Sequence, residues 1–140
     1  MTDRFRLTLA QSNPIVGDIA GNAALASRVW QQGRDASADM VALPEMFITG
    51  YQTQDMVMKP AFYTAAMAAI SALALRIVDG PALGIGGPCL QNGQLYNAYY
   101  ILAEGKIAAT VLKHDLPNDG VFDEKRIFAA SPPQGPYRIG

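Results

Sequence analysis

Residues 40–45 read Met-Val-Ala-Leu-Pro-Glu, an apolar run closed by a proline and a carboxylate. The apolar residues predict a short buried strand over 39–43, and Pro44 ends it because proline lacks the N–H that a strand ladder needs. Proline also biases its neighbour towards extended geometry, so Glu45 leaves the ladder at the carboxyl end of the strand. In open α/β sheets pockets form at these strand ends, which makes Glu45 a candidate site residue.

The residues before this strand predict a β-α-β unit. Alternating polar and apolar residues over 5–11 indicate a first strand, and turn residues follow it. A helix is expected over 23–37 with Asn22 as its N-cap. The strands on either side of this helix should be parallel.

After a loop over 46–59, a helix over 60–78 is predicted to begin at Pro60. Three strands follow, over 83–90, 95–102 and 107–112. They are joined through Asn92-Gly93 and Glu104-Gly105, and Asn-Gly favours the positive φ angles of a type I′ hairpin turn. The sequence therefore predicts an α/β fold with a mixed sheet. It shows no repeat and no internal domain boundary.

A second apolar run, residues 107–112, ends in Lys113, and the charged segment 120–126 follows it. We therefore expect an acid and an amine at the ends of two buried strands, Glu45 and Lys113. An acid and a base placed together in this way indicate catalysis.

Two segments resemble catalytic motifs of the nitrilase (carbon-nitrogen hydrolase) superfamily: residues 40–51, MVALPEMFITGY, and residues 112–128, LKHDLPNDGVFDEKRIF. The amino-acid sequences of residues 116–126 and 9–18 (LAQSNPIVGD) resemble one branch of this superfamily, the glutaminase domains of glutamine-dependent NAD synthetases. The resemblance covers essentially the whole chain. It implies a nitrilase-type αββα sandwich with mixed sheets, of which residues 1–140 would be the N-terminal portion.

The resemblance also implies roles for individual residues. A nucleophilic cysteine would attack the side-chain amide of glutamine, Glu45 would act as general base and Lys113 would stabilise the oxyanion. Glu124 resembles a second carboxylate of the family, which positions the lysine and the substrate. The charged atoms of these three residues should then lie within about 3 to 5 Å of one another, with Glu45 and Lys113 ending neighbouring strands.

Three further residues resemble substrate-binding positions. Tyr51 and Phe122 match positions that shape the glutamine pocket. Asp119 departs from the branch, which usually has a substrate-contacting tyrosine there. The family's nucleophile follows a strand whose opening resembles 137–140, so we expect that cysteine beyond Gly140 and interpret the chain as an N-terminal fragment.

In the branch, the released ammonia reaches a C-terminal ATP-dependent synthetase domain, which amidates deamido-NAD. The resemblance thus implies glutamine as substrate, a synthetase domain in cis and a homo-oligomer. ATP and Mg are expected only in the synthetase domain, with no cofactor or metal in this chain. Two alternatives stay open: a stand-alone amidase or carbamoylase, and a non-catalytic pseudoenzyme or interaction module. Sequence beyond Gly140 would discriminate between them.

Each candidate also has a structural interpretation. Glu45 could be a helix-start carboxylate, Lys113 a solvated strand-end charge, and Glu124 part of an exposed helical turn with local ion pairs. Cys89 is the only thiol, but it lies in a strand-like run without basic neighbours, so we expect a buried small hydrophobe. His114 should point away from Lys113 in an extended segment and serve structure.

Composition excludes several classes of function. A net charge of −1 without clustered Lys and Arg argues against nucleic acid or a membrane surface as partner. One cysteine and one histidine exclude an intramolecular disulfide framework and a structural zinc cluster. This cysteine usage and the lack of a signal sequence fit the cytoplasm.

Overall fold

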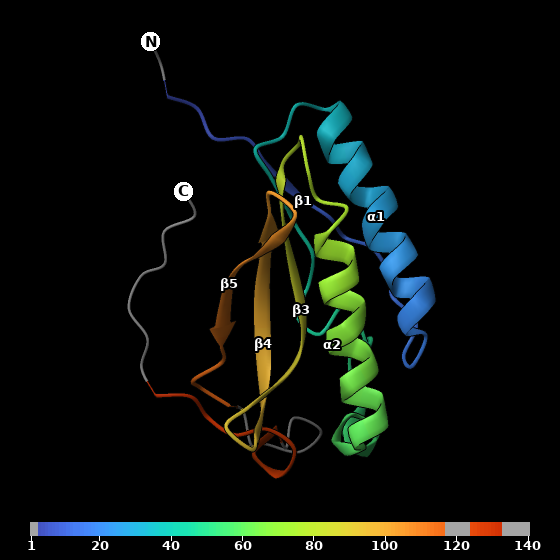
Figure 1. Cartoon of the computed structure of the whole chain (residues 1–140), viewed down its shortest axis with the longest axis vertical. Helices are drawn as coiled ribbons and strands as arrows, with labels where there is room; N and C mark the ends of the chain where they lie inside the picture. The colour runs from blue at the N-terminus through green and yellow to red at the C-terminus, as the bar shows by residue number, and fades with distance from the viewer. Residues whose placement is uncertain (1–2, 117–123, 133–140) are drawn as a thin grey trace.

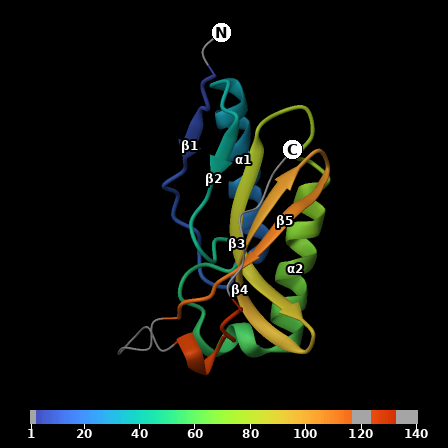
Figure 2. The ribbon, with the colours of Figure 1, turned by 90° about the vertical axis from the view of Figure 1, so that its left-hand side faces the viewer.

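The computed structural model describes residues 3–116 and 124–132, in which two α-helices pack side by side on one face of a five-stranded sheet (Figures 1 and 2). No helix in these two ranges is both long enough and apolar enough to cross a membrane. The elements in chain order are β1 (Leu7–Leu9), α1 (Ile19–Asp35), β2 (Met40–Ala42), η1 (Gln54–Met58), α2 (Pro60–Ala74), β3 (Ala82–Gln91), β4 (Gln94–Ala103), β5 (Lys106–Leu112) and η3 (Glu124–Arg126).

The sheet is mixed, as the sequence predicted. Its strand order is β1-β2-β3-β4-β5, with parallel pairing from β1 to β3 and antiparallel pairing from β3 to β5. Asn92 and Gly93 have φ angles of 52° and 76°, and Glu104 and Gly105 have 54° and 77°. Positive φ at both central residues matches the type I′ hairpin, which explains the antiparallel half.

Both ends of α1 and the end of α2 differ from the predicted helix boundaries, 23–37 and 60–78. The N-cap of α1 is Asp18, whose carboxylate accepts from the Gly21 N–H at 3.0 Å, so the prediction of Asn22 as cap was wrong. Asn22 lies inside α1, and its amide donates to the carbonyls of Ile15 and Ile48. The second helix, α2, ends at Ala74, where the chain tightens into turns: the N–H groups of Arg76 and Ile77 donate to Leu73 O and Ala74 O.

The hydrophobic core lies between the two helices and the sheet. Strand side chains alternate between the two faces, and the residues that point to the helices include Leu83 and Ile85 of β3 and Tyr100 and Leu102 of β4. Trp30 of α1 belongs to this core, and its ring N–H donates to Pro81 O at 2.8 Å. We call the opposite side of the sheet the open face, because neither α1 nor α2 covers it.

The open face exposes large apolar side chains on β1. Leu7 is 49% and Leu9 70% exposed, whereas Thr8 between them lies near Gly33 of α1. Exposed apolar side chains of this size on an uncovered sheet face are typical of surfaces that become buried by another layer or partner.

We predict that the chain of residues 1–140, prepared alone, self-associates through the open face. Leu9→Lys should therefore shift the population towards monomer, as measured by analytical ultracentrifugation. Leu75→Lys is the matched control, since Leu75 is 72% exposed but lies at the end of α2. A wild-type chain that is monomeric and melts cooperatively would contradict the prediction.

Candidate active site

Glu45 lies on the open face, directly over β3. The segment that leaves β2 continues along β3, with Leu43 N–H donating to Gly84 O and Ile48 N–H donating to Gly86 O. A Cβ on Gly86 would lie 2.2 Å from the backbone nitrogen of Met46 and 2.8 Å from Cα of Glu45. Only glycine allows this approach, which moves Glu45 sideways from its own strand towards the next ones.

Lys113 directly follows β5, and its N–H donates to Asn97 O at 2.8 Å, which extends the β4–β5 ladder by one residue. The expectation that Lys113 ends a buried strand neighbouring that of Glu45 was wrong. β5 is an edge strand and largely solvent-accessible, and β3 and β4 separate it from β2. The two side chains meet because the chain crosses β3 at Gly86.

The structure brings the three predicted charged groups together. Lys113 Nζ lies 2.6 Å from Glu45 Oε1 and 2.9 Å from Glu124 Oε1. The predicted convergence of these atoms is therefore confirmed, while the catalytic roles of the residues stay predictions. One ammonium between two carboxylates makes charge-assisted hydrogen bonds with both of them.

The two carboxylates have different surroundings. The Glu45 side chain is 44% exposed, whereas that of Glu124 is 7% exposed, so Glu124 does not lie on an exposed turn. Within the described residues Glu124 Oε2 is buried without a hydrogen-bond partner. The carboxylate that is open to a ligand is thus Glu45, and the enclosed one is Glu124.

A small apolar cluster fixes the three segments that bear these charges. Met46, Val57, Leu116 and Phe128 are buried against one another. Met46 follows Glu45, Leu116 lies three residues after Lys113 and Phe128 lies four residues after Glu124. Packing of this cluster therefore aligns the backbones from which the charged side chains project.

Lys113 keeps its charge across the neutral range. Partial burial alone would lower its pKa, but the hydrogen bonds and the charge attraction of Glu45 and Glu124 outweigh that cost and raise the pKa above its ordinary value of 10.5. A positive charge is thereby held among the residues that line the site.

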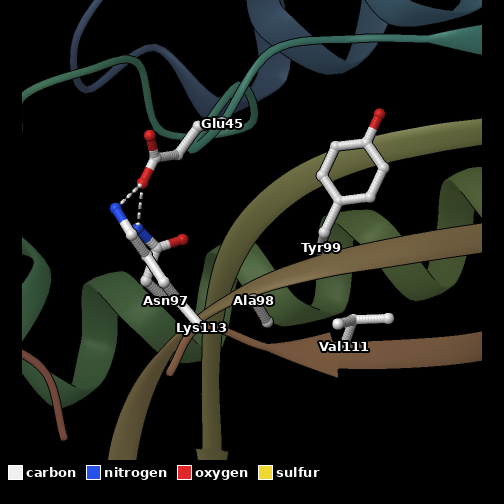
Figure 3. A pocket seen from close by; sticks show the side chains of 6 residues that line it. All are labelled: Glu45, Asn97, Ala98, Tyr99, Val111 and Lys113. Atoms are coloured by element: carbon white, nitrogen blue, oxygen red, sulfur yellow. Dashed lines mark hydrogen bonds and ion pairs between the residues drawn. The ribbon is translucent and has the colours of Figure 1, made fainter. Parts of the chain in front are cut away.

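A cavity of about 400 Å³ opens on the open face beside Glu45 and Lys113 (Figure 3). Its lining includes Asn97, which we did not predict as a site residue; its Nδ2 donates to Glu45 Oε1 at 2.6 Å. Tyr99 also lines the cavity, but its hydroxyl donates to Leu43 O. The full lining is Glu45, Asn97, Ala98, Tyr99, Val111 and Lys113.

A sequence signal for Asn97 exists. If Asn92-Gly93 is a two-residue turn, β4 and β3 pair in a fixed register, and Asn97 becomes a polar side chain on the face opposite Ala98 and Tyr100. A lone amide among apolar and aromatic neighbours in a central strand requires a hydrogen-bond partner, and this could have marked it.

Of the three predicted substrate-binding residues, Tyr51 alone falls within the described part of the chain. Tyr51 is 42% exposed on the loop after β2 and does not belong to the lining. Phe122 and Asp119 lie outside the described residues.

Cys89 lies in the core between sheet and helices, 8% exposed, as predicted. Strand alternation places it on the helix side of β3, opposite the open face. His114 Nδ1 contacts Ser131 O, a backbone contact consistent with the structural interpretation. In the described part of the chain, no group of three or more His, Cys, Asp or Glu side chains could hold a metal ion.

The arrangement can perform part of an acyl transfer. A half-exposed carboxylate can accept a proton, and the ammonium beside it can stabilise negative charge on an oxygen in the cavity. The described site contains no thiol nucleophile. The only cysteine of the chain, Cys89, faces the other side of the sheet.

A family model described as carbon-nitrogen hydrolase matches residues 6–137. The chain belongs to the carbon-nitrogen hydrolase family.

Two relatives carry the same description, glutamine-dependent NAD(+) synthetase. The protein from Rhodobacter capsulatus is 60% identical over 140 residues, which is 100% of this chain and 25% of the relative. The protein from Thermotoga maritima is 32% identical over 125 residues, covering 89% of this chain and 22% of the relative. This carbon-nitrogen hydrolase chain thus spans about a quarter of the length of these relatives.

Solved structures share the fold. The glutamine-dependent NAD+ synthetase from Acinetobacter baumannii, in complex with ADP, matches with a TM-score of 0.87 and 28% identity over 96% of this chain and 26% of that one. An amidase from Nesterenkonia sp. matches with a TM-score of 0.79 and 20% identity over 94% of this chain and 50% of that one, a likeness of fold alone. The predicted nitrilase-type α/β fold is confirmed.

We predict that Lys113→Met destabilises the domain by an amount on the order of 2 kcal/mol, as measured by urea unfolding. The loss arises because Glu124 stays buried without its cation; it should stay below that of a fully buried pair, since the Lys113 side chain is 30% exposed. Adding Glu124→Gln should recover part of the loss. Lys106→Met, on the exposed start of β5, is the control. Simple additivity of the two site substitutions would contradict the prediction.

Proposed function

We propose that this chain forms the N-terminal part of the glutamine-hydrolysing domain of a glutamine-dependent NAD synthetase. The observation that carries the proposal is Lys113, held between an open carboxylate, Glu45, and a buried one, Glu124. The 60% identity to the Rhodobacter capsulatus relative over the whole chain supports the choice of this branch. Residues 1–140 would belong to a single domain without an internal boundary.

In the proposed reaction, a cysteine supplied by the rest of the protein attacks the side-chain amide carbon of glutamine. Glu45 accepts the thiol proton and returns it to the departing nitrogen, which leaves as ammonia. Lys113 stabilises the oxyanion of the tetrahedral intermediate, for which its raised pKa guarantees the charge. Glu124 holds Lys113 from the buried side, and water then releases glutamate from the thioester.

The remaining assignments extend this proposal to the complete protein. Tyr51, Phe122 and Asp119 would contribute to glutamine binding. The ammonia would pass to a C-terminal synthetase domain in cis, where ATP and Mg serve the amidation of deamido-NAD. We propose a homo-oligomer located in the cytoplasm, the latter supported by the low cysteine content of the chain.

We predict that Glu45→Gln and Lys113→Ala in the full-length protein each lower glutamine-driven NAD synthesis by a factor on the order of 100 or more. Synthesis from free ammonia should persist, because these residues do not act in the amidation. Both rates are measured by NAD formation. Glu104→Gln and Lys106→Ala, two exposed charges at the other end of β5, are the matched controls. An equal loss with free ammonia would mean that Glu45 and Lys113 serve structure.

A second prediction concerns residues 1–140 alone. This chain should release no ammonia from glutamine, because a base and an oxyanion stabiliser without a thiol in the site form no acyl intermediate. Ammonia release by the purified chain, if abolished by Cys89→Ser, would show that our assignment of Cys89 to the core is wrong for function.

A further inference from the structure

Asn97 is a buried polar side chain whose amide bonds to the candidate base. It lies in β4 and is 3% exposed. Burial of an amide is costly unless its groups are hydrogen-bonded, and here the side-chain donor goes to Glu45 Oε1 at 2.6 Å. The sheet itself does not need this bond, because the backbone of Asn97 already takes part in the ladder with β3 and with Lys113.

Two donors meet on a single oxygen of Glu45. Lys113 Nζ and Asn97 Nδ2 each lie 2.6 Å from Oε1, and the other carboxylate oxygen points away from both nitrogens (Figure 3). Within the described residues, the hydrogen bonds to this carboxylate all end on Oε1. Among the groups that the structure describes, Oε2 is therefore the oxygen left to accept a proton.

Lys113 alone fixes the orientation of the Glu45 carboxylate only weakly. Its ammonium is a point charge on a flexible stem, and it is shared with Glu124. Asn97 has a short side chain on a central strand, and its own carbonyl accepts the Lys113 N–H at 2.8 Å. Asn97 thus holds the Glu45 carboxylate with its side-chain amide and the Lys113 backbone with its backbone carbonyl.

We propose that Asn97 is a positioning residue for the proposed glutamine hydrolysis: it pins Oε1 of Glu45 beside Lys113 and presents Oε2 to the substrate side as the base. The proposal rests on the proposed function. It assigns Asn97 no contact with the reacting atoms.

The test uses the full-length protein with Asn97→Leu and Asn97→Asp. Asn97→Leu keeps the size and removes the donor, so the kcat of glutamine hydrolysis should fall about 10- to 100-fold, the range for removing an orienting partner. KM for glutamine should change less than about threefold, and the ammonia-driven rate should stay the same.

Asn97→Asp adds a measurement that a structural role would not move. At neutral pH a carboxylate at position 97 repels Glu45, and kcat should fall at least as far as in Asn97→Leu. As the pH falls, the introduced carboxylate becomes protonated and regains an O–H donor. The kcat of Asn97→Asp relative to wild type should therefore rise towards acid pH, while that of Asn97→Leu, which gains no donor on protonation, should not rise.

The matched control is Asn22→Asp, the same replacement at a second buried asparagine, whose side-chain bonds to the described residues all go to backbone groups. It should lower the thermal midpoint and leave kcat within about twofold at all pH values. If Asn97→Leu does not fold, Asn97→Asp carries the test; if neither folds, Asn97 is structural and the proposal is overturned.

Three other results would also overturn it: kcat within twofold of wild type in Asn97→Leu, a parallel loss of the ammonia-driven rate, or a pH-independent ratio for Asn97→Asp. Failure of the proposed function itself is distinguishable, because Glu45→Gln would then leave glutamine-driven synthesis intact in the same assays.

Discussion

The close approach of one backbone to another at Gly86 is the constraint on which the site depends. The space that a side chain would fill at this position is taken by the backbone of Glu45 and Met46. The chain leaving β2 can therefore lie flat on β3, hydrogen-bonded to Gly84 and Gly86, before it enters the loop. Without this crossing Glu45 would stay over its own strand, two strands away from the β4–β5 hairpin that bears Asn97 and Lys113.

The second constraint is electrostatic. Lys113 pairs with two carboxylates that differ in exposure, and in the proposed reaction this difference separates their tasks. Two acids in unlike surroundings commonly take unlike roles in an active site. Glu124, the first residue of η3, is buried and bonds to the ammonium, whereas Glu45 lines the cavity and remains accessible.

Much of the fold follows from local rules, and the site follows only in part. Pro60 and the Asn92-Gly93 turn act through their own backbone geometry, so the start of α2 and the antiparallel half of the sheet were predictable. The N-cap of α1 was misassigned because Asp18 and Asn22 are both good caps, and the choice depends on the tertiary bonds of Asn22 to Ile15 and Ile48. The family motifs located Glu45, Lys113 and Glu124. They did not reveal that β2 and β5 are not neighbours, since strand order is a property of the whole sheet.

Asn97 shows why such residues escape an interpretation based on motifs. The position of its side chain depends on the register of the β3–β4 pair. A shift of β4 by one residue would turn the Asn97 amide into the core and bring Ala98 or Tyr96 towards Glu45. The hairpin turn and the alternation of β4 thus decide which side chain meets the carboxylate. A site assembled from a crossing loop, an edge strand and a central strand gains its order from the fold before any ligand binds. Donors fixed in this way need no rearrangement when charge develops, which is the condition under which electrostatic stabilisation is most effective.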